Sequence, residues 1–430
     1  MWISQLLSSD AVRRYTDALS YRDYRTLWTA NLSAHAASWA LIVARGWLVF
    51  AMSDSSLWVG VVTFTAMIPR VLVTPFTGYL SDRFDRKKVL ASMFAINLSH
   101  NILLAALIMT GTAEVWHIVL LSLVDGSARA TQMPAGQALI PNLVPKSALL
   151  NAVALNQATQ QGSRLIGPAA IAPLLASSGP EGAFLLCTGF YAISLIQALR
   201  LQTKSTGEID KNQSFSRNLL EGLLYVYRHP QLRAIVFMAL FHCGLTMSFE
   251  SLLPTLSRQH LNAEGAGFSY LMMAVGAGAL FSALVLAGIR SEVSRGRAFF
   301  YVGILSGVSP ALLAIAGATS GSMTLALASA VILGASTAGF MTLTHTMIQQ
   351  IIPDGVRGRV AGVYSVHIGG TMAIINLVNG GVADYIDAPT ILAFGGIVFL
   401  LIVIWSLKYP PTREIYVGGL RQNQVITAAD

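Results

Sequence analysis

Apolar runs about as long as a membrane crossing recur along the whole chain, and they constrain its fold more than any other feature. Runs of about 20 mainly apolar residues match the hydrocarbon thickness of a bilayer when they are helical. Of the 430 residues 54% are apolar and only 11% are charged, whereas soluble proteins average about 25% charged residues. The sequence therefore predicts an all-α integral membrane protein.

Counting these runs gives twelve spans in two sets of six, separated by the longest polar stretch of the chain. The spans lie near 26–52, 56–80, 89–110, 115–138, 151–175 and 183–201, and then near 233–256, 267–288, 298–318, 323–347, 359–380 and 389–408. The spacing of Leu219, Leu223 and Val226 predicts an interfacial helix in the polar stretch. We expect an N-terminal segment, a six-helix bundle, a linker, a second six-helix bundle and a tail, at 1–20, 21–201, 202–230, 231–409 and 410–430.

Basic residues are unevenly distributed between the two sides that this count of spans defines. Most of the 28 lysines and arginines fall before the first span, in the linker, in the tail and in the loops near 83–88, 290–297 and 357–359. Cytoplasmic loops of membrane proteins carry such an excess. We therefore expect both termini to lie in the cytoplasm.

A short pattern recurs in the two halves of the chain. Gly78 and Asp82 close the second span before a basic run, and Gly288 and Glu292 stand in the same way at the end of the eighth. Parallel six-span repeats relate two halves around an axis along the membrane normal. We therefore expect two pseudo-symmetric bundles with a binding site between them, near the middle of the membrane.

The loop after the second span has the chemistry of a gating latch. It reads Gly78-Tyr-Leu-Ser-Asp82-Arg83-Phe-Asp85-Arg86-Lys87-Lys88, and the gating residues would be Gly78, Asp82, Arg83, Arg86 and Lys87. A glycine allows close helix approach, a carboxylate favours a helix N-terminus, and arginines can bridge to another helix in one conformation only. The alternative is that these basic residues only set the topology. The loop resembles the signature loop of the major facilitator superfamily, with Asp85 where that family usually has a second glycine.

Further motifs extend the resemblance over nearly the whole chain, to the enterobactin-exporter-like group of that superfamily, also called transmembrane secretion effectors. They are Tyr21-Arg-Asp-Tyr-Arg-Thr-Leu-Trp28, Pro134-Ala-Gly-Gln-Ala-Leu-Ile-Pro141-Asn-Leu-Val-Pro145, Asn151-Ala-Val-Ala-Leu-Asn156, Ser163-Arg-Leu-Ile-Gly-Pro168, Glu221-Gly-Leu and Arg357-Gly-Arg-Val360. The resemblance implies the twelve-helix major facilitator fold, a place in the plasma (inner) membrane of a bacterium, and export of a small molecule. This group exports varied compounds, so the substrate does not follow from it.

Gly167 and Pro168 in the fifth span resemble the core of the antiporter motif of the superfamily. Proline bends a helix and glycine lets a neighbour approach, so this helix-kink motif could seal one side against leakage. Ser163, Ile171 and Ala172 replace glycines that the motif expects. The alternative is a kink of purely structural meaning.

Ionisable and amide side chains inside the spans are the best pointers to a binding site, because burying them in a membrane is costly. Span four carries Ser122, Asp125, Arg129, Gln132 and Gly136 on one helical face, and Asp125 and Arg129 can pair at i, i+4. The resemblance implies that spans one, two, four and five line or flank the N-terminal half of a cavity. The candidates for the substrate and proton pathway are His35, Arg45, Arg70, Asp125, Arg129, Gln157, Gln161, Arg164, His242, Glu250 and His367.

The charges within the spans bear on the substrate and on the coupling ion. Four arginines stand against two acids, Asp125 and Glu250, and an excess of guanidinium favours carboxylate, phenolate or phosphate ligands. This predicts an anionic or amphiphilic substrate, such as a siderophore; alternatively the arginines hold helices together. Asp125 is either a proton carrier or a salt-bridge partner of Arg129, and Glu250 is either a proton carrier or merely interfacial. His100 is interpreted as structural.

The sequence also excludes several classes of protein. It contains no GxxxxGK[ST], HExxH or GxSxG motif, so it predicts neither an ATP-driven pump nor an enzyme. Cys187 and Cys243 have no disulfide or metal-site spacing, and we expect no metal, no cofactor and no nucleic-acid partner. The prediction is a monomeric, proton-coupled exporter of a small molecule that works by alternating access. The alternatives are an importer or uniporter of the same fold, or a non-transporting membrane receptor or assembly partner.

Overall fold

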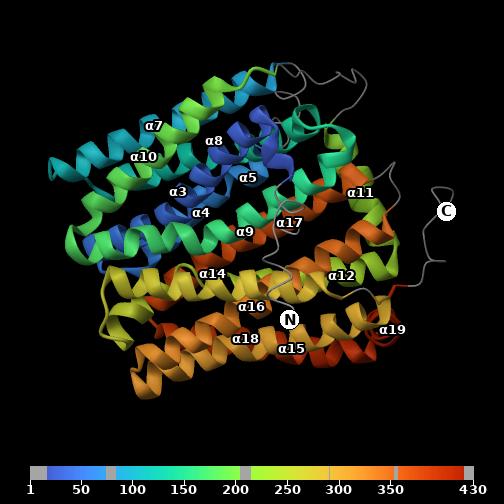
Figure 1. Cartoon of the computed structure of the whole chain (residues 1–430). Coiled ribbons are helices and arrows are strands. Elements are labelled where there is room, and N and C mark those ends of the chain that lie inside the picture. The colour runs from blue at the N-terminus through green and yellow to red at the C-terminus, as the bar shows by residue number, and fades with distance from the viewer. Residues whose placement is uncertain (1–16, 74–83, 204–214, 290, 353–356, 421–430) are drawn as a thin grey trace, which may run out of the picture. The chain divides into compact units, whose positions relative to one another are not determined.

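The computed structural model describes residues 17–73, 84–203, 215–289, 291–352 and 357–420, and these form helices joined by short turns, with no strand among them (Figure 1). The first predicted span is α3 (Arg22–Ser53). The second begins with α4 (Ser56–Met67) and α5 (Pro69–Leu72). The next four are α7 (Arg86–Met109), α8 (Val115–Leu143), α9 (Lys146–Ser177) and α10 (Gly179–Arg200).

The second half of the chain begins with the linker helix that the sequence predicts, α11 (Phe215–Arg228). The seventh span is α12 (Pro230–His242), continued by the π-helical turn Cys243–Met247, by α13 (Leu253–Thr255) and by a second π-helical turn, Leu256–His260. The remaining spans are α14 (Gly265–Ala287), α15 (Glu292–Ile315), α16 (Met323–Ile351), α17 (Arg357–Ala383) and α18 (Ala388–Trp405). A short helix, α19 (Pro410–Gly418), follows them.

The lengths and apolar character of these helices confirm the prediction of an all-α membrane protein. Nine of the described helical segments are long and apolar enough to cross a membrane, and Ser56–Leu72 is a shorter apolar segment. The other two predicted spans correspond to α8 and α9, which are 29 and 32 residues long. These two helices carry five of the eleven residues predicted for the substrate and proton pathway.

The chain divides into two compact units. Unit 1 comprises Met1–Ala44 and Leu72–Asp210, and unit 2 comprises Arg45–Val71 and Lys211–Asp430. One boundary therefore falls inside α3, and the second half of that helix groups with α4 and with the second six spans. The bundles predicted at 21–201 and 231–409 follow the order of the chain, and they stay a prediction.

In unit 1, α7 contacts both α8 and α10, and α9 packs on the first half of α3 (Figure 1). The contact between α9 and α3 depends on Gly167. A Cβ atom at Gly167 would come within 2.5 Å of the Ala36 carbonyl oxygen and 2.8 Å of the Ala40 nitrogen. Small residues allow such close approach of helices where lipid supplies no hydrophobic driving force between them.

In unit 2, α16 packs between α14 and α15, and α15 also contacts α18. Gly278 on α14 and Gly334 on α16 are so close to the opposite helix that a Cβ on either would fall 1.9 Å from a backbone oxygen. At the start of α15, the short helix α19 is held by the buried side chains of Ile415 and Tyr416. Burial raises the pKa of the Tyr416 phenol to about 12.

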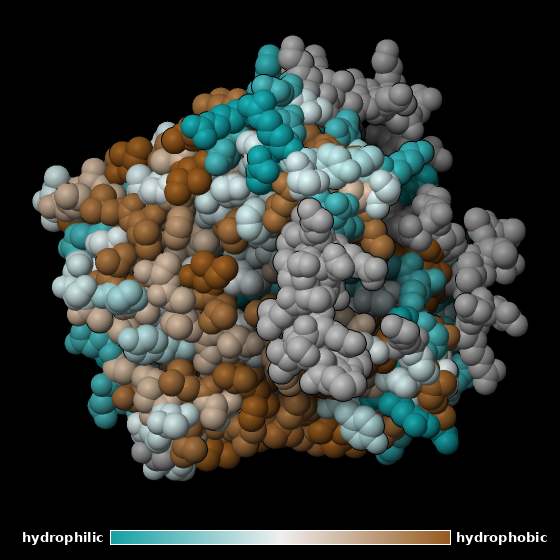
Figure 2. Space-filling model, in the orientation of Figure 1, coloured by the Kyte–Doolittle hydropathy of each residue, from teal (hydrophilic) through white to brown (hydrophobic). Residues whose placement is uncertain are grey.

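The outward faces of the helices carry large apolar side chains. Phe281 and Leu284 on α14 are mostly exposed, as are Leu401 and Trp405 on α18. Figure 2 shows apolar side chains gathered over the middle of α15 and α18 and hydrophilic ones near α19. Continuous exposed apolar surface is rare on soluble proteins, and here it is the surface that lipid covers.

Candidate functional site

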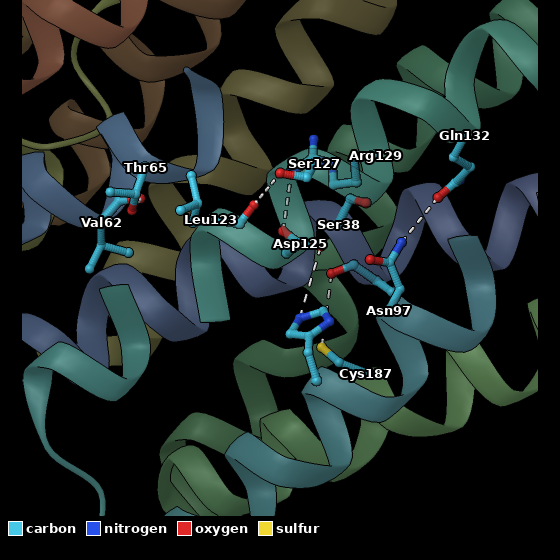
Figure 3. A network of polar contacts seen from close by, with 12 residues as sticks. Ser38, Val62, Thr65, Asn97, Leu123, Asp125, Ser127, Arg129, Gln132 and Cys187 are labelled. Carbon is cyan, nitrogen blue, oxygen red and sulfur yellow. Dashed lines mark hydrogen bonds and ion pairs between the residues drawn. The ribbon is translucent and has the colours of Figure 1, made fainter. Parts of the chain in front are cut away.

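A buried carboxylate on α8 is the centre of a charged cluster in unit 1. The Asp125 side chain is 0% exposed, and its Oδ2 lies 3.8 Å from Nη1 of Arg129. His100 Nε2 lies 4.0 Å from Asp125 Oδ1, and the Tyr191 hydroxyl donates to the same oxygen at 3.5 Å. Ser38 Oγ is 3.2 Å from the Tyr191 hydroxyl oxygen. Figure 3 shows Ser38 and Arg129 near this carboxylate.

The cluster draws on four helices, and only one of its contacts is local in the sequence. Asp125 and Arg129 share a face of α8 because they are four residues apart, and the predicted pair is present. His100 comes from α7, Tyr191 from α10 and Ser38 from α3. The structure thus places His100, which the sequence analysis interpreted as structural, beside the candidate proton carrier.

A second polar group in unit 1 consists mainly of carboxamides. The Asn97 side-chain amide donates to Gln132 Oε1 at 3.2 Å (Figure 3), and the Asn31 amide donates to Asn156 Oδ1 at 3.2 Å. A small pocket of about 10 Å³, with room for about one water molecule, lies among α3, α8 and α9. Its lining residues are Asn31, His35, Gln132, Met133, Gly136, Gln137, Asn156 and Gln160.

His35 is one of the predicted site residues, and Gln132 belongs to the predicted polar stripe of the fourth span. Asn31 and Asn156 were not predicted, although Asn31 lies one helical turn before His35 and so shares its face. Carboxamides offer both donors and acceptors, so this pocket can bind hydroxyl, amide and carboxylate groups.

The other predicted site residues on α9 lie outside the Asp125 cluster. Arg164 is half-buried, with its guanidinium carbon 4.5 Å from the centre of the Trp39 ring. Gln157 is exposed and Gln161 is half-buried. Pro168 is buried within the continuous helix α9, next to Gly167.

The remaining pathway candidates belong to unit 2. Arg45 is only 2% exposed, whereas Arg70 is exposed, with its side chain beside Gly369. Glu250 is buried. His367 Nε2 lies 3.2 Å from the Tyr227 hydroxyl, and its Nδ1 lies 2.8 Å from the Val363 carbonyl oxygen.

His242 lies deep in the aromatic core of unit 2. It is fully buried, and its Nε2 is 2.8 Å from Ser306 Oγ. Its ring stacks on Phe340 with centroids 4.4 Å apart and meets Phe399 edge-on at 5.1 Å. These contacts explain its position as part of helix packing.

Part of the predicted gating motif can be located. Gly78, Asp82 and Arg83 lie outside the described residues. Arg86 Nη1 donates to the Ala138 carbonyl at 3.0 Å, and the Lys87 ammonium donates to the Leu201 carbonyl. Asp85 directly precedes α7 as its N-cap, where its carboxylate accepts from the Lys87 amide at 3.0 Å. Because a carboxylate is a good N-cap, this contact gives Asp85, where the resemblance expects glycine, a role of its own.

In unit 2, one carboxylate makes a contact between helices that the sequence did not predict. Asp384 follows the last turn of α17 and binds the first turn of α4: its Oδ1 accepts from the Ser56 amide at 2.6 Å, and its Oδ2 accepts from the Ser55 hydroxyl. A Cβ at Gly380 would lie 2.5 Å from the Ser56 carbonyl oxygen, so the two helices also touch along their backbones. Asp384 thus caps the N-terminus of a helix that begins 328 residues earlier in the chain.

The long apolar helices with polar side chains buried among them are those of a multi-pass membrane protein. The fold matches a mutant of the nucleoside transporter NupG with a TM-score of 0.73 at 14% identity, over 90% of this chain and 100% of that one. The model of the transmembrane secretion effector family matches residues 17–415, and the chain belongs to that family.

Two relatives show the range of the family. The staphyloferrin A transporter of Staphylococcus aureus (strain NCTC 8325 / PS 47) is 22% identical over 76% of this chain and 81% of its own length. The multidrug efflux pump Tap of Mycolicibacterium fortuitum is 24% identical over 90% of this chain and 95% of its own length. The chain is accordingly a transporter of small molecules and not an enzyme.

Proposed function

We propose that this transporter is a proton-coupled exporter that works by alternating access in the plasma membrane of a bacterium, with both termini in the cytoplasm. The observation that carries the coupling is the Asp125 cluster. An ionisable group fully buried in a transmembrane helix is costly, and such groups mark proton relays and substrate paths. The relatives named for staphyloferrin A and for multidrug efflux support small-molecule transport, and the second supports the outward direction.

Asp125 is the proton carrier in this proposal. Its carboxylate has a cation, an imidazole and a phenol hydroxyl as neighbours. Protonation of Asp125 weakens its attraction to Arg129, which is 19% exposed and therefore able to reorient. Histidine changes charge near physiological pH, so His100 can share the proton. A change in protonation thereby becomes a change in the contacts between α7, α8 and α10.

The substrate is a small anionic or amphiphilic molecule, and the carboxamide pocket of unit 1 supplies the first polar contacts to it. A carboxylate or hydroxyl finds amide donors there from Asn31, Gln132 and Asn156. Arg164 lies on α9, the helix that also contributes Asn156 and Gln160 to the pocket. Its guanidinium adds positive charge on that helix, which favours an anion.

The test uses the full chain in sealed inside-out vesicles with an imposed proton gradient. We expect an organic anion such as staphyloferrin A to accumulate in preference to the drug-like cations of the same panel, and to release protons from the lumen. Asp125→Asn should abolish the link between proton and substrate movement. Glu114→Gln, which changes an exposed acid before the same helix, should behave as wild type.

Several results would overturn the proposal. Accumulation that persists without a proton gradient and is unchanged in Asp125→Asn would remove the coupling. Uptake into right-side-out vesicles, in the direction of the proton gradient, would establish the importer. A preference for organic cations throughout the panel would contradict the assignment of an anionic substrate.

A further inference from the structure

We propose that unit 2 contains a binding site for a soft monovalent metal ion of the Cu(I) class, formed by the sulfur atoms of Cys243, Met247 and Met341. The Cys243 thiol points at both thioethers. Its Sγ lies 3.7 Å from Met341 Sδ and 4.0 Å from Met247 Sδ. This cluster is separate from the polar groups of unit 1 and has no part in the proposed transport mechanism.

A local departure from the α-helix brings these sulfurs together. Cys243 and Met247 are the first and last residues of the π-helical turn that continues α12. Single π-helical turns within α-helices are rare and occur frequently at functional sites. Met341 comes from α16, which packs against α12. Two ligands therefore come from one turn and the third from a neighbouring helix, so the ligand set is held by the packing of unit 2.

The spacing of the sulfurs fits a three-coordinate ion. A d¹⁰ metal binds thiolate sulfur at about 2.3 Å, and three sulfurs in a plane at that radius lie about 4.0 Å from one another. The two measured separations, 3.7 and 4.0 Å, agree with this value. The thioether side chains can close the small difference because methionine has three rotatable bonds.

The chemistry of the ligands selects the ion. Thiolate and thioether sulfur favour Cu(I), whereas carboxylate, carbonyl and water suit magnesium, calcium and manganese. The described residues contain no group of three or more histidine, cysteine, aspartate and glutamate side chains that could hold a metal. Methionine lies outside that set, which is why the spacing of histidines and cysteines in the sequence gave no indication of this site.

Charge balance favours a monovalent ion in particular. Binding displaces the thiol proton of Cys243, because the thiolate is the ligand. One thiolate and one monovalent cation make a neutral complex, and a neutral complex avoids the cost of burying net charge. Cys243 is fully buried, whereas Met247 and Met341 are half-buried. The two thioethers therefore lie on the side from which an ion can enter.

The experiment titrates the reduced full-length chain in detergent with Cu(I), without oxygen, against a chromophoric Cu(I) chelator of known affinity. We expect one ion per chain, and an X-ray absorption spectrum with a shell of sulfur neighbours at about 2.3 Å. Cys243→Ser and Met341→Leu should each weaken binding by about tenfold or more, since loss of even an outer-shell partner costs 10–100-fold.

The chain offers a matched control in its other cysteine. Cys187 is equally buried, in unit 1, where its Sγ lies 4.0 Å from the Ala37 carbonyl oxygen. Cys187→Ser should keep wild-type affinity. Met341→Leu conserves side-chain volume, so it keeps the test decisive if Cys243→Ser fails to fold. The proposal is overturned if the wild type binds no Cu(I), if Met341→Leu binds as tightly as wild type, or if the spectrum shows nitrogen or oxygen neighbours alone.

Discussion

The contact of Asp384 with the start of α4 predicts a conformational equilibrium that one substitution should shift. Asp384→Ala removes the acceptor of the Ser56 amide and of the Ser55 hydroxyl. Loss of an N-cap costs about 0.5–2 kcal/mol, and loss of a negative charge at a helix N-terminus costs about 0.3–1 kcal/mol. The close backbone contact at Gly60 and Gly380 remains. We therefore expect the contact of α4 with α17 to weaken by about 1–2 kcal/mol, a factor of about 5–30 in population.

Pulsed electron paramagnetic resonance between two spin labels measures this shift. Trp58 on α4 and Tyr385 after α17 are suitable label sites, because their side chains are 40% and 91% exposed. In detergent or nanodiscs, the ratio of separated to contacting helices should rise by the factor given above. Because the loss includes a charge interaction, high salt should reduce the difference between variant and wild type.

A neighbouring carboxylate provides the control. Asp387 accepts from the Thr390 amide and hydroxyl and so caps its own helix, α18. Asp387→Ala loses a cap of the same kind without touching α4. If Asp384→Ala leaves the distance distribution unchanged, or if Asp387→Ala shifts it equally, Asp384 does not hold α4 against α17 and the reasoning is refuted.

Three further substitutions test packing and polar contacts. Gly167→Ala places a methyl group 2.5 Å from the Ala36 carbonyl oxygen and should lower the free energy of unfolding by about 1–3 kcal/mol in thermal unfolding. Gly189→Ala, with open space around it, should be neutral, and equal stability of the two variants would contradict this prediction. Glu221→Gln breaks the half-exposed ion pair with Arg359 at 2.7 Å and should lower the free energy of unfolding by about 0.2–1 kcal/mol at low salt. A destabilisation that persists in molar salt would contradict an electrostatic origin. Tyr191→Phe removes the hydroxyl between Asp125 and Ser38 and should lower the free energy of unfolding in urea by about 0.5–1.5 kcal/mol. An unchanged urea midpoint would show that these hydrogen bonds do not contribute to stability.

The sequence predicts the spans of this fold well because each must cross the same apolar thickness. Helices α14 and α18 are apolar on every face, and their observed ends lie within a few residues of the predicted ones. Helices α8 and α9 were also predicted from their apolar runs, although neither is among the nine segments that are clearly apolar enough to cross a membrane. The π-helical turn at Cys243 has no such signal, because a single inserted residue leaves the apolar run unbroken.

Side-chain contacts could be predicted only where they are local. The Asp125–Arg129 pair follows from a spacing of four residues on one helix. Tyr191 reaches Asp125 across a sequence separation of 66 residues, and its aromatic ring is ordinary in an apolar span. Asp384 stands in a polar turn, where an acid needs no explanation, and only the folded chain reveals that it binds Ser56. Both depend on which helices become neighbours, and apolar periodicity does not encode that.

The positions of the arginines limit how much positive charge they can offer to a substrate. Counted along the sequence, four arginines in the spans suggest a positive cavity, but each guanidinium acts where it lies. Arg129 is paired with Asp125, and Arg164 lies against the face of Trp39, an interaction that itself stabilises a cation. Part of the positive charge is therefore used within unit 1. The anionic substrate that we propose would then have to gain affinity from neutral donors as well, and the carboxamides of Asn31, Gln132 and Asn156, which line the pocket, are the donors that we expect to supply it. A site of this kind orients a ligand by hydrogen bonds as much as by charge, which fits a family whose members carry chemically different compounds.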